Sequence, residues 1–382
     1  MAPDRLSMPA PSPEASAHSE RVVARIRAEI AAAGGWIGFD RYMELALYAP
    51  GLGYYAAGAR KFGSGGAGGD FVTAPEISPL FAQALAALAA QVLGHAAPHI
   101  VEFGAGTGAL ARDLLAALDA RGTTVGSYGI VELSADLRER QRSLLTDTRV
   151  HWLASPPRDF RGLIVANEVL DVMPVRLFVR GHGTLYERGV ALRDGALAFE
   201  TRPADATLAE AVAEIEAEVG ALPAGYGAEV GLVARGWMRS AGQWLAHGAL
   251  LALDYGFPRR EYYHPQRIMG TLMCHYRHHA HADPLWLPGL NDITAHVDFT
   301  AMAQAAHDGG LDVLGYTTQA HVLLNCGLLE LLREQRTPAA ANAAHRLISE
   351  AEMGELVKVL AVGRGIDAPL LGFTRGDRAH TL

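Results

Sequence analysis

The chain has 382 residues, a hydrophobic share of 50% and a formal net charge of −8. These values indicate a globular protein with a sizeable core, and they exclude a global basic field of the kind that attracts nucleic acid. The two cysteines, Cys274 and Cys326, are too few for a disulfide framework, and no apolar run reaches the length of a membrane span.

The N-terminal region predicts a tail followed by a helical and loop-rich extension. Residues 1–18 are rich in Pro, Ala and Ser and lack the apolar core of a signal peptide. We therefore expect a disordered tail in a cytoplasmic protein. The extension, residues 19–98, is expected to open with a helix at Ser19. It closes with an alanine-rich helix over about 79–93, which Ser78 caps.

Core strands are predicted after this extension, at 99–103, 127–132, 149–153, 162–167, 249–254, 311–317 and 355–362. Helical segments lie between the early strands, which favours an α/β fold with a mostly parallel sheet. This core spans residues 99–382 and carries two long insertions. The insertion near 174–248 is expected to form a β-meander and helices. The one near 256–310 is rich in His and aromatic residues.

A glycine-rich turn lies between the first core strand and a helix. Gly104, Gly106 and Gly108, with Thr107 among them, let a ligand approach the backbone because no Cβ stands in the way. The pattern resembles the first motif of S-adenosylmethionine (SAM) methyltransferases, and it also fits a variant of the dinucleotide fingerprint. Glu102 favours SAM, because a carboxylate can bind the methionine ammonium whereas it would repel a pyrophosphate.

An acid also ends the second core strand. Glu132 can accept hydrogen bonds from both ribose hydroxyls of an adenosine ligand, so we predict it as a cofactor contact together with the neighbouring Leu133. The alternative is that Glu132 is an acid at a helix start beside Ser134.

The fourth core strand runs into Asn167, Glu168 and Asp171. In a doubly wound methyltransferase this strand end lies beside the sulfonium. Asparagine can orient a donor nitrogen through its carbonyl, and a carboxylate can hold a cationic nucleophile and help to remove its proton. These residues suit a nitrogen nucleophile. The alternative is helix capping by Asn167 with solvated acids.

Most of the chain resembles the MidA family, whose mitochondrial member is a complex I assembly factor and protein-arginine methyltransferase. The matching segments are 48–55, 69–78, the glycine turn, 167–175, 254–256, 270–272, 276–279, 292–299 and 353–355. Two departures stand out: the glycine run 63–69 is longer than the family's usual loop, and Ala74 replaces its usual Ser.

The resemblance implies a seven-stranded, Rossmann-like SAM methyltransferase sheet of order 3-2-1-4-5-7-6, with an N-terminal helical extension and inserted lobes. It implies SAM as the cofactor and arginine in a protein partner as the acceptor, such as a respiratory complex I subunit. It also implies that the loop carrying Asp70 and Thr73 closes over SAM, with a simple Asx turn as the alternative. We expect no metal and no nucleic acid partner.

His296, with Asp292 and Asp298 beside it in the sequence, is a further candidate, because histidine is the usual proton acceptor near neutral pH. The segment 294–299 fits a capped helix start equally well. Glu168, Asp171 and Asp298 are the acids predicted to hold a guanidinium, whose pKa exceeds about 12, and to accept its proton.

The acceptor peptide is expected in a cleft between the carboxyl edge of the sheet and the segments 174–200 and 262–300. These segments carry aromatic residues that we expect to be exposed and able to stack on a guanidinium, namely Tyr262, Tyr263, Tyr276 and Trp286.

Two other functions stay open. A SAM-binding assembly chaperone with little catalysis would keep the glycine turn and need only a partner surface. A nicotinamide-dependent dehydrogenase would give no account of Asn167 and Glu168.

Overall fold

The central sheet of the protein has the strand order that the sequence predicts. The computed structural model describes residues 8–57 and 73–382. Seven strands lie side by side in the order β15-β16-β10-β5-β2-β3-β4, which is 3-2-1-4-5-7-6 when the core strands are numbered along the chain. Their bounds are β2 (His99–Phe103), β3 (Ser127–Val131), β4 (Val150–Leu153), β5 (Phe160–Asn167), β10 (Leu245–Phe257), β15 (Asp312–Thr318) and β16 (Val357–Arg364).

Five of these strands run parallel to one another, namely β2, β3, β4, β5 and β10. Strand β16 is antiparallel to both of its neighbours. Two-residue β14 (Val297–Asp298) pairs with the end of β10. Parallel strands covered on both faces are apolar throughout, as in Leu163–Ala166 and Leu250–Leu253, where every residue is buried. This sheet is therefore the core of an α/β fold.

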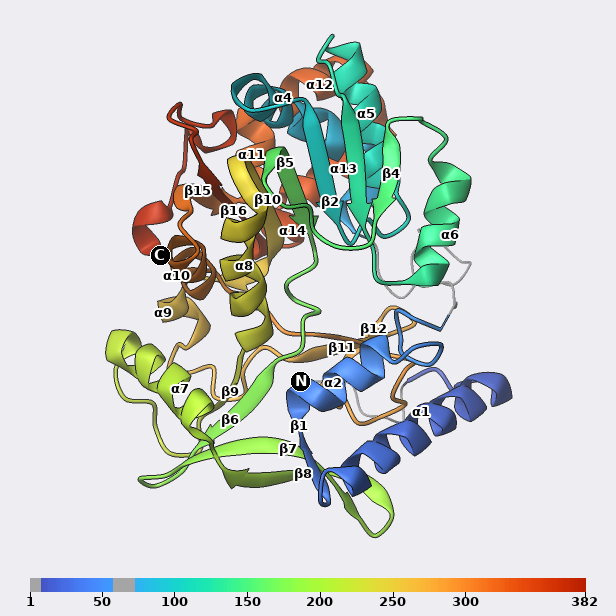
Figure 1. The fold of residues 1–382 in the computed structure, drawn as a ribbon, viewed down its shortest axis with the longest axis vertical. Helices are drawn as coiled ribbons and strands as arrows, with labels where there is room; N and C mark the ends of the chain where they lie inside the picture. Colours follow the sequence, from blue (N-terminus) through green and yellow to red (C-terminus); the bar gives the residue numbers. More distant parts are fainter. Residues whose placement is uncertain (1–7, 58–72) are drawn as a thin grey trace.

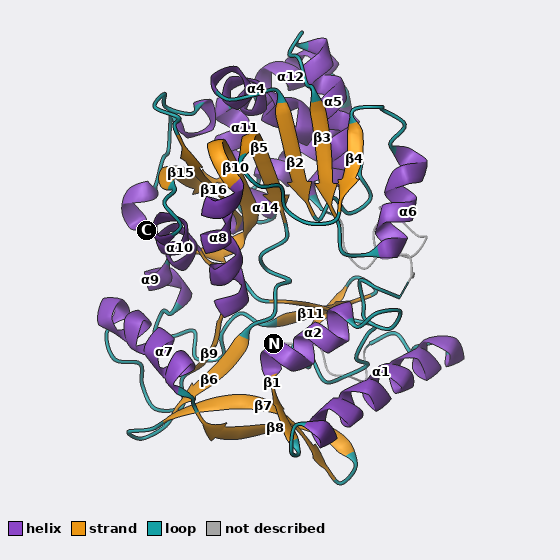
Figure 2. Ribbon diagram, in the orientation of Figure 1, coloured by secondary structure: helices purple, strands orange, loops and turns teal. Residues whose placement is uncertain are grey.

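Helices cover both faces of the central sheet (Figure 2). On one face α4 and α5 pack with the C-terminal helices, and on the other α8 and α10 pack together. Helix α6 lies beside the β4 edge (Figure 1). The bounds are α4 (Pro79–His95), α5 (Ala109–Ala120), α6 (Ala135–Leu144), α8 (Leu232–Trp244), α10 (Phe299–Asp308), α11 (Gln319–Asn325), α12 (Leu328–Gln335), α13 (Pro338–Ile348) and α14 (Met353–Leu356), with short 3-10 helices at Leu371–Phe373 and Ala379–Thr381.

A second lobe lies beyond the carboxyl ends of the parallel strands (Figure 1). It contains a five-stranded sheet of order β1-β7-β6-β9, with β8 on β7, and a three-stranded sheet β12-β11-β13. Its strands are β1 (Trp36–Gly38), β6 (Arg176–Arg180), β7 (Leu185–Arg193), β8 (Ala196–Pro203), β9 (Gly227–Val230), β11 (Met273–Tyr276), β12 (His279–His281) and β13 (Asp292–Thr294). The helices outside the central sheet's layers are α1 (Pro13–Ala32), α2 (Phe39–Tyr48), α7 (Ala206–Val219) and α9 (Arg259–Tyr262), whereas the short helix α3 (Ala74–Ile77) packs against α4 and α5.

The lobe joins segments that the sequence analysis treats as separate parts. Strand β1 of the N-terminal extension pairs antiparallel with β7 of the first insertion, with Ile37 opposite Val190. One apolar cluster holds Ile26, Val190 and Ile293, which come from the extension and from both insertions. The extension and the two insertions therefore build a single lobe.

The predicted boundaries need three corrections. Helix α1 begins at Pro13 with Ser12 as its cap, so residues 13–18 are helical and do not belong to a tail. Helix α4 packs on the sheet, so the core begins before residue 99. Helices α8 and α10 also pack on the sheet, which assigns the last residues of each predicted insertion to the core. Within the described ranges, no helix is both long and apolar enough to cross a membrane.

Candidate active site

A cavity of about 1360 Å³ lies between the carboxyl edge of the sheet and the lobe. Of the sequence-predicted residues, those that line it are Thr73, Glu102, Gly104, Gly106, Thr107, Glu132, Leu133, Asn167, Glu168, Asp171 and His296. Gly108 and Asp298 do not line it. Asp70 lies outside the described residues, so its predicted contact with the cofactor stays a prediction.

The glycine turn presents its backbone to this cavity. Gly104, Gly106 and Gly108 have φ of 62°, 53° and 89°, which side chains with a Cβ rarely adopt. A Cβ at Gly104 would stand 3.0 Å from the Val169 side chain, and one at Gly108 would crowd a neighbouring leucine. Gly108 is the residue before α5. It therefore shapes the turn without lining the cavity.

Glu102 lies under the turn on β2. It is 2% exposed, and its carboxylate accepts a hydrogen bond of 2.7 Å from the Tyr128 hydroxyl. Burial raises the pKa of Glu102 to about 7. At neutral pH this group is therefore only partly ionised.

The surroundings of Glu132 fit both interpretations that the sequence leaves open, an acid at a helix start and a side chain that can contact the cofactor. One carboxylate oxygen accepts from the backbone N–H of Ser134 at 2.9 Å, and the other accepts from the Gln141 amide at 3.2 Å. The side chain also lines the cavity, beside Leu133, which is 80% exposed. Gln141 also donates to the Gly106 carbonyl at 2.9 Å, so it links the turn to Glu132. The sequence holds no signal for this role of Gln141.

The acids after β5 are arranged by Asp254, a residue that the sequence analysis noted only as part of a family motif. One oxygen of this buried carboxylate accepts from the backbone N–H groups of Val169, Leu170 and Asp171 at 3.1, 2.8 and 3.3 Å. These three donors converge because Glu168 adopts a positive φ of 52°. The turn thereby directs Asp171 into the cavity.

The alternative of a helix cap with solvated acids is wrong. Among the described elements, the one that comes next after Asn167 is strand β6 and not a helix, and Asp171 is 6% exposed. The Asn167 amide donates to Glu168 at 3.2 Å, while its own carbonyl oxygen is buried and accepts no hydrogen bond from the described residues. The same holds for Oδ1 of Asp171. Two acceptors thus lie at the cavity wall without a donor.

Burial and mutual repulsion favour the neutral forms of these acids. Burial, together with the Asp254 carboxylate, raises the pKa of Glu168 to about 8. Burial and the neighbouring Asp254, Glu168 and Asp292 carboxylates raise the pKa of Asp171 well above its usual range. A cation placed among these groups would favour their ionised forms.

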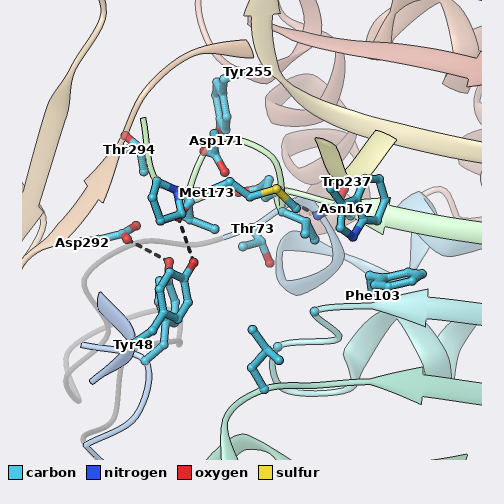
Figure 3. A pocket seen from close by; sticks show the side chains of 18 of the residues that line it. Tyr48, Thr73, Phe103, Asn167, Asp171, Met173, Trp237, Tyr255, Asp292 and Thr294 are labelled. Atoms are coloured by element: carbon cyan, nitrogen blue, oxygen red, sulfur yellow. Dashed lines mark hydrogen bonds between the residues drawn. The ribbon is translucent and has the colours of Figure 1, made fainter. Parts of the chain in front are cut away.

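Two stacked tyrosines form another part of the wall (Figure 3). The rings of Tyr48 and Tyr55 lie 5.6 Å apart at 19°. The Tyr55 hydroxyl donates to Asp292 at 2.8 Å, and the Tyr48 hydroxyl donates to the Val172 carbonyl at 2.9 Å. These contacts tie the N-terminal extension to the turn that carries Asp171. In the sequence, both tyrosines stand out only as part of the family match over 48–55.

Two predicted catalytic residues are placed differently from expectation. Asp298 pairs with Arg259 at 3.1 Å and caps α10 by accepting from the Ala301 N–H, so its role is structural. His296 lines the cavity, but burial lowers its pKa to about 4, so its imidazole is a weak base. Asp292 is engaged with Tyr55 instead of forming a pair with His296.

Of the four aromatic residues expected to be exposed on the second insertion, three are buried and the fourth, Trp286, is half-buried. Tyr262, Tyr263 and Tyr276 are 2–4% exposed, and Trp286 packs edge-on against Tyr276. Tyr262 donates to the buried Glu229. These rings hold the lobe together, so the prediction that they stack on a substrate is wrong. Segment 174–200 contributes little to the cavity wall, where residues of α2 stand instead.

Comparison with known proteins places these features in a family. Residues 80–317 match a family model described as "Putative S-adenosyl-L-methionine-dependent methyltransferase". The mitochondrial protein arginine methyltransferase NDUFAF7 of Danio rerio is 30% identical over 374 residues, covering 86% of this chain and 84% of that protein. The Drosophila melanogaster homologue is 27% identical over 430 residues, with coverage of 97% and 93%.

A solved structure matches nearly the whole chain. It is a Burkholderia thailandensis protein bound to S-adenosyl-homocysteine, 52% identical, with a TM-score of 0.94 and coverage of 98% of this chain and 100% of that one. The cavity described above fits such a ligand, because it offers an open glycine turn, an acid at the end of β3 and acceptors without donors at the end of β5. The chain therefore belongs to this family of SAM-dependent methyltransferases, the MidA family, and SAM is its cofactor.

Proposed function

We propose that the protein methylates a guanidinium nitrogen of an arginine in a protein partner. The observation that carries this proposal is the group of acids and orphaned acceptors at the end of β5. Glu168, Asp171 and Asn167 line the cavity together, and Oδ1 of Asp171 and of Asn167 accept no hydrogen bond from the described residues. A guanidinium carries five N–H donors and a permanent positive charge. It can therefore donate to the two acceptors that lack a donor, and its charge complements the acids of the site.

The residues of the site can also orient the guanidinium and accept the proton that it loses on methylation. SAM, when bound, supplies an electrophilic methyl group. Asp171 and Asn167 accept N–H bonds from the guanidinium and orient one nitrogen for in-line attack. As the new N–C bond forms, that nitrogen must lose a proton. The pKa of Glu168 is about 8 in the absence of substrate, and the bound guanidinium charge favours its ionised form, so the carboxylate can then accept this proton near neutral pH.

The relatives named as protein arginine methyltransferases support the same acceptor. A respiratory complex I subunit is the first partner to test, on the strength of the family resemblance alone.

The test is mass spectrometry of peptides from candidate partners after incubation with SAM. Each arginine peptide is paired with a version in which lysine replaces the arginine. We expect methyl groups on arginine only, and none with the Asp171→Asn variant. Glu139→Gln serves as the matched control, because Glu139 is an acid whose side chain is 76% exposed. Methylation of the lysine version at a similar rate, or normal activity of Asp171→Asn, would refute the proposal.

A further inference from the structure

The cofactor carries an α-ammonium group, and the cavity offers two carboxylates near the glycine turn that could hold it. Glu102 precedes the turn on β2, and Glu76 lies on α3. Both line the cavity. The family match does not decide between these two side chains.

Glu102 is the less suitable of the two. It lies on a central strand with β3 on one side and β5 on the other, and the Tyr128 hydroxyl already donates to it. At 2% exposure it is enclosed beneath the turn. If Glu102 were ionised next to an ammonium, its carboxylate would have to keep the hydrogen bond from Tyr128 or find another donor inside the sheet.

Glu76 lines the cavity from α3, which lies against α5, the helix that follows the glycine turn. Burial raises the pKa of Glu76, and Thr107 of the glycine turn, which lines the same cavity, acts against this rise. Oε2 of Glu76 is buried and accepts no hydrogen bond from the described residues. A buried acceptor without a donor is costly, so this oxygen calls for a ligand.

The short helix that carries Glu76 is held in place. The Ala74 N–H donates to Glu168 at 3.4 Å, and α3 lies against α4 and α5. Directly after α3, the Ser78 side chain accepts from the Leu80 N–H at the start of α4. The Glu76 carboxylate is therefore positioned before any ligand binds.

We propose that Glu76, rather than Glu102, holds the α-ammonium of bound SAM. With the ribose at Glu132, as predicted, the amino-acid end of the cofactor extends across the turn toward Thr107 and Glu76. The ammonium then donates to Oε2 of Glu76. This assignment does not depend on which acceptor is methylated.

The test is a binding cycle with two ligands and no turnover. S-adenosyl-homocysteine and its deaminated analogue, in which hydrogen replaces the ammonium, are titrated calorimetrically into wild type, Glu76→Gln and Glu102→Gln. For Glu76→Gln we expect S-adenosyl-homocysteine to bind about 10-fold to 100-fold more weakly, the range for a hydrogen bond between charged groups. The deaminated analogue should bind that variant as it binds wild type, and Glu102→Gln should keep the wild-type ratio of the two affinities.

The ratio of the two affinities decides the outcome. If Glu76→Gln keeps the wild-type ratio, including the case in which both ligands weaken equally, the assignment is overturned. A selective loss in Glu102→Gln alone would transfer the role to Glu102. Thermal unfolding without ligand confirms that each variant is folded. If Glu76→Gln does not fold, Glu76→Asp, which keeps the charge but withdraws it by one methylene, should show a smaller selective loss, and an unchanged ratio again overturns the proposal.

Discussion

Replacing Glu168 by glutamine should change how the stability of the protein depends on pH. Oε1 of Glu168 accepts from the Asn167 amide at 3.2 Å and from the Ala74 N–H at 3.4 Å. Glutamine has the same shape and can keep this oxygen in place. The difference between wild type and the Glu168→Gln variant is therefore mainly the ability to ionise.

The magnitude follows from the raised pKa. Burial and Asp254 raise the pKa of Glu168 from 4.5 to about 8. At about 1.4 kcal/mol for each tenfold change, ionising this group in the folded protein costs at most about 5 kcal/mol. The side chain is partly exposed to an open cavity, so screening by water reduces the expected cost to about 2–3 kcal/mol.

The sign is that of an acid whose pKa is higher in the folded than in the unfolded state. Below about pH 4.5 the group is protonated in both states and has no effect. As the pH rises from about 4.5 to about 8, the unfolded chain loses its proton first, so the free energy of unfolding falls. Asp171 and Asp254 contribute with the same sign. The difference between variant and wild type therefore reports the ionisation of Glu168 together with its effect on the neighbouring Asp171.

The assay is urea unfolding without cofactor, followed by circular dichroism from about pH 5 to about pH 9. We expect Glu168→Gln to become progressively more stable than wild type as the pH rises, with the gain levelling off above about pH 8. The exposed Glu139→Gln variant should follow wild type throughout. Parallel curves for Glu168→Gln and wild type would show that Glu168 is ionised in the folded protein, and the reasoning would fail.

Three further predictions test other parts of the site. Glu132→Ala should weaken SAM binding by about 1.5–3 kcal/mol by calorimetry, because the carboxylate that we predict to bond the ribose is lost; an unchanged dissociation constant would remove Glu132 from the cofactor site. Tyr55→Phe should lower the free energy of unfolding by about 1–3 kcal/mol, since buried Asp292 loses a hydroxyl donor, and an unaltered urea midpoint would contradict this. Gly108→Ala should cost about 1–2 kcal/mol, since φ is 89° and the new Cβ would lie 3.1 Å from Leu145; a folded variant of wild-type stability would argue against the strain.

The central sheet could be predicted from the sequence because each of its signals is local. Runs such as Leu163–Ala166 are apolar on both faces, and the glycine turn marks the start of α5. The family resemblance then supplied the strand order. Segments of this kind can be assigned from their own residues, without knowledge of contacts with residues distant in the sequence.

The lobe could not be predicted in the same way, because its contacts are distant in the sequence. Strand β1 has three residues and pairs with a strand that begins at Leu185. The burial of Tyr262 likewise depends on a partner outside its own segment, Glu229. A tyrosine in a loop-rich insertion looks the same in the sequence whether it is exposed or enclosed.

Within the site, residue types were predicted better than residue roles. Asp171 and Asp298 are both acids close to a strand end, and the sequence does not distinguish them. Asp254 directs the chain after β5 so that Asp171 lines the cavity, whereas Arg259 and the start of α10 take up Asp298. The raised pKa values also arise from acids that meet only in the folded chain.

The pairing of β1 with β7 has a consequence for the order in which the protein is made. Trp36 lies opposite Ala191, so the N-terminal strand must wait for more than a hundred further residues to be synthesised before its partner exists. The first sheet strands and α5 lie within that interval and can associate first, since their contacts are closer in the chain. The part of the cavity wall that α2 forms is then among the later parts of the structure to assemble during synthesis. A slowed ribosome between residues 40 and 190 would leave the apolar faces of α1 and α2 uncovered, which makes this interval a candidate for chaperone contact.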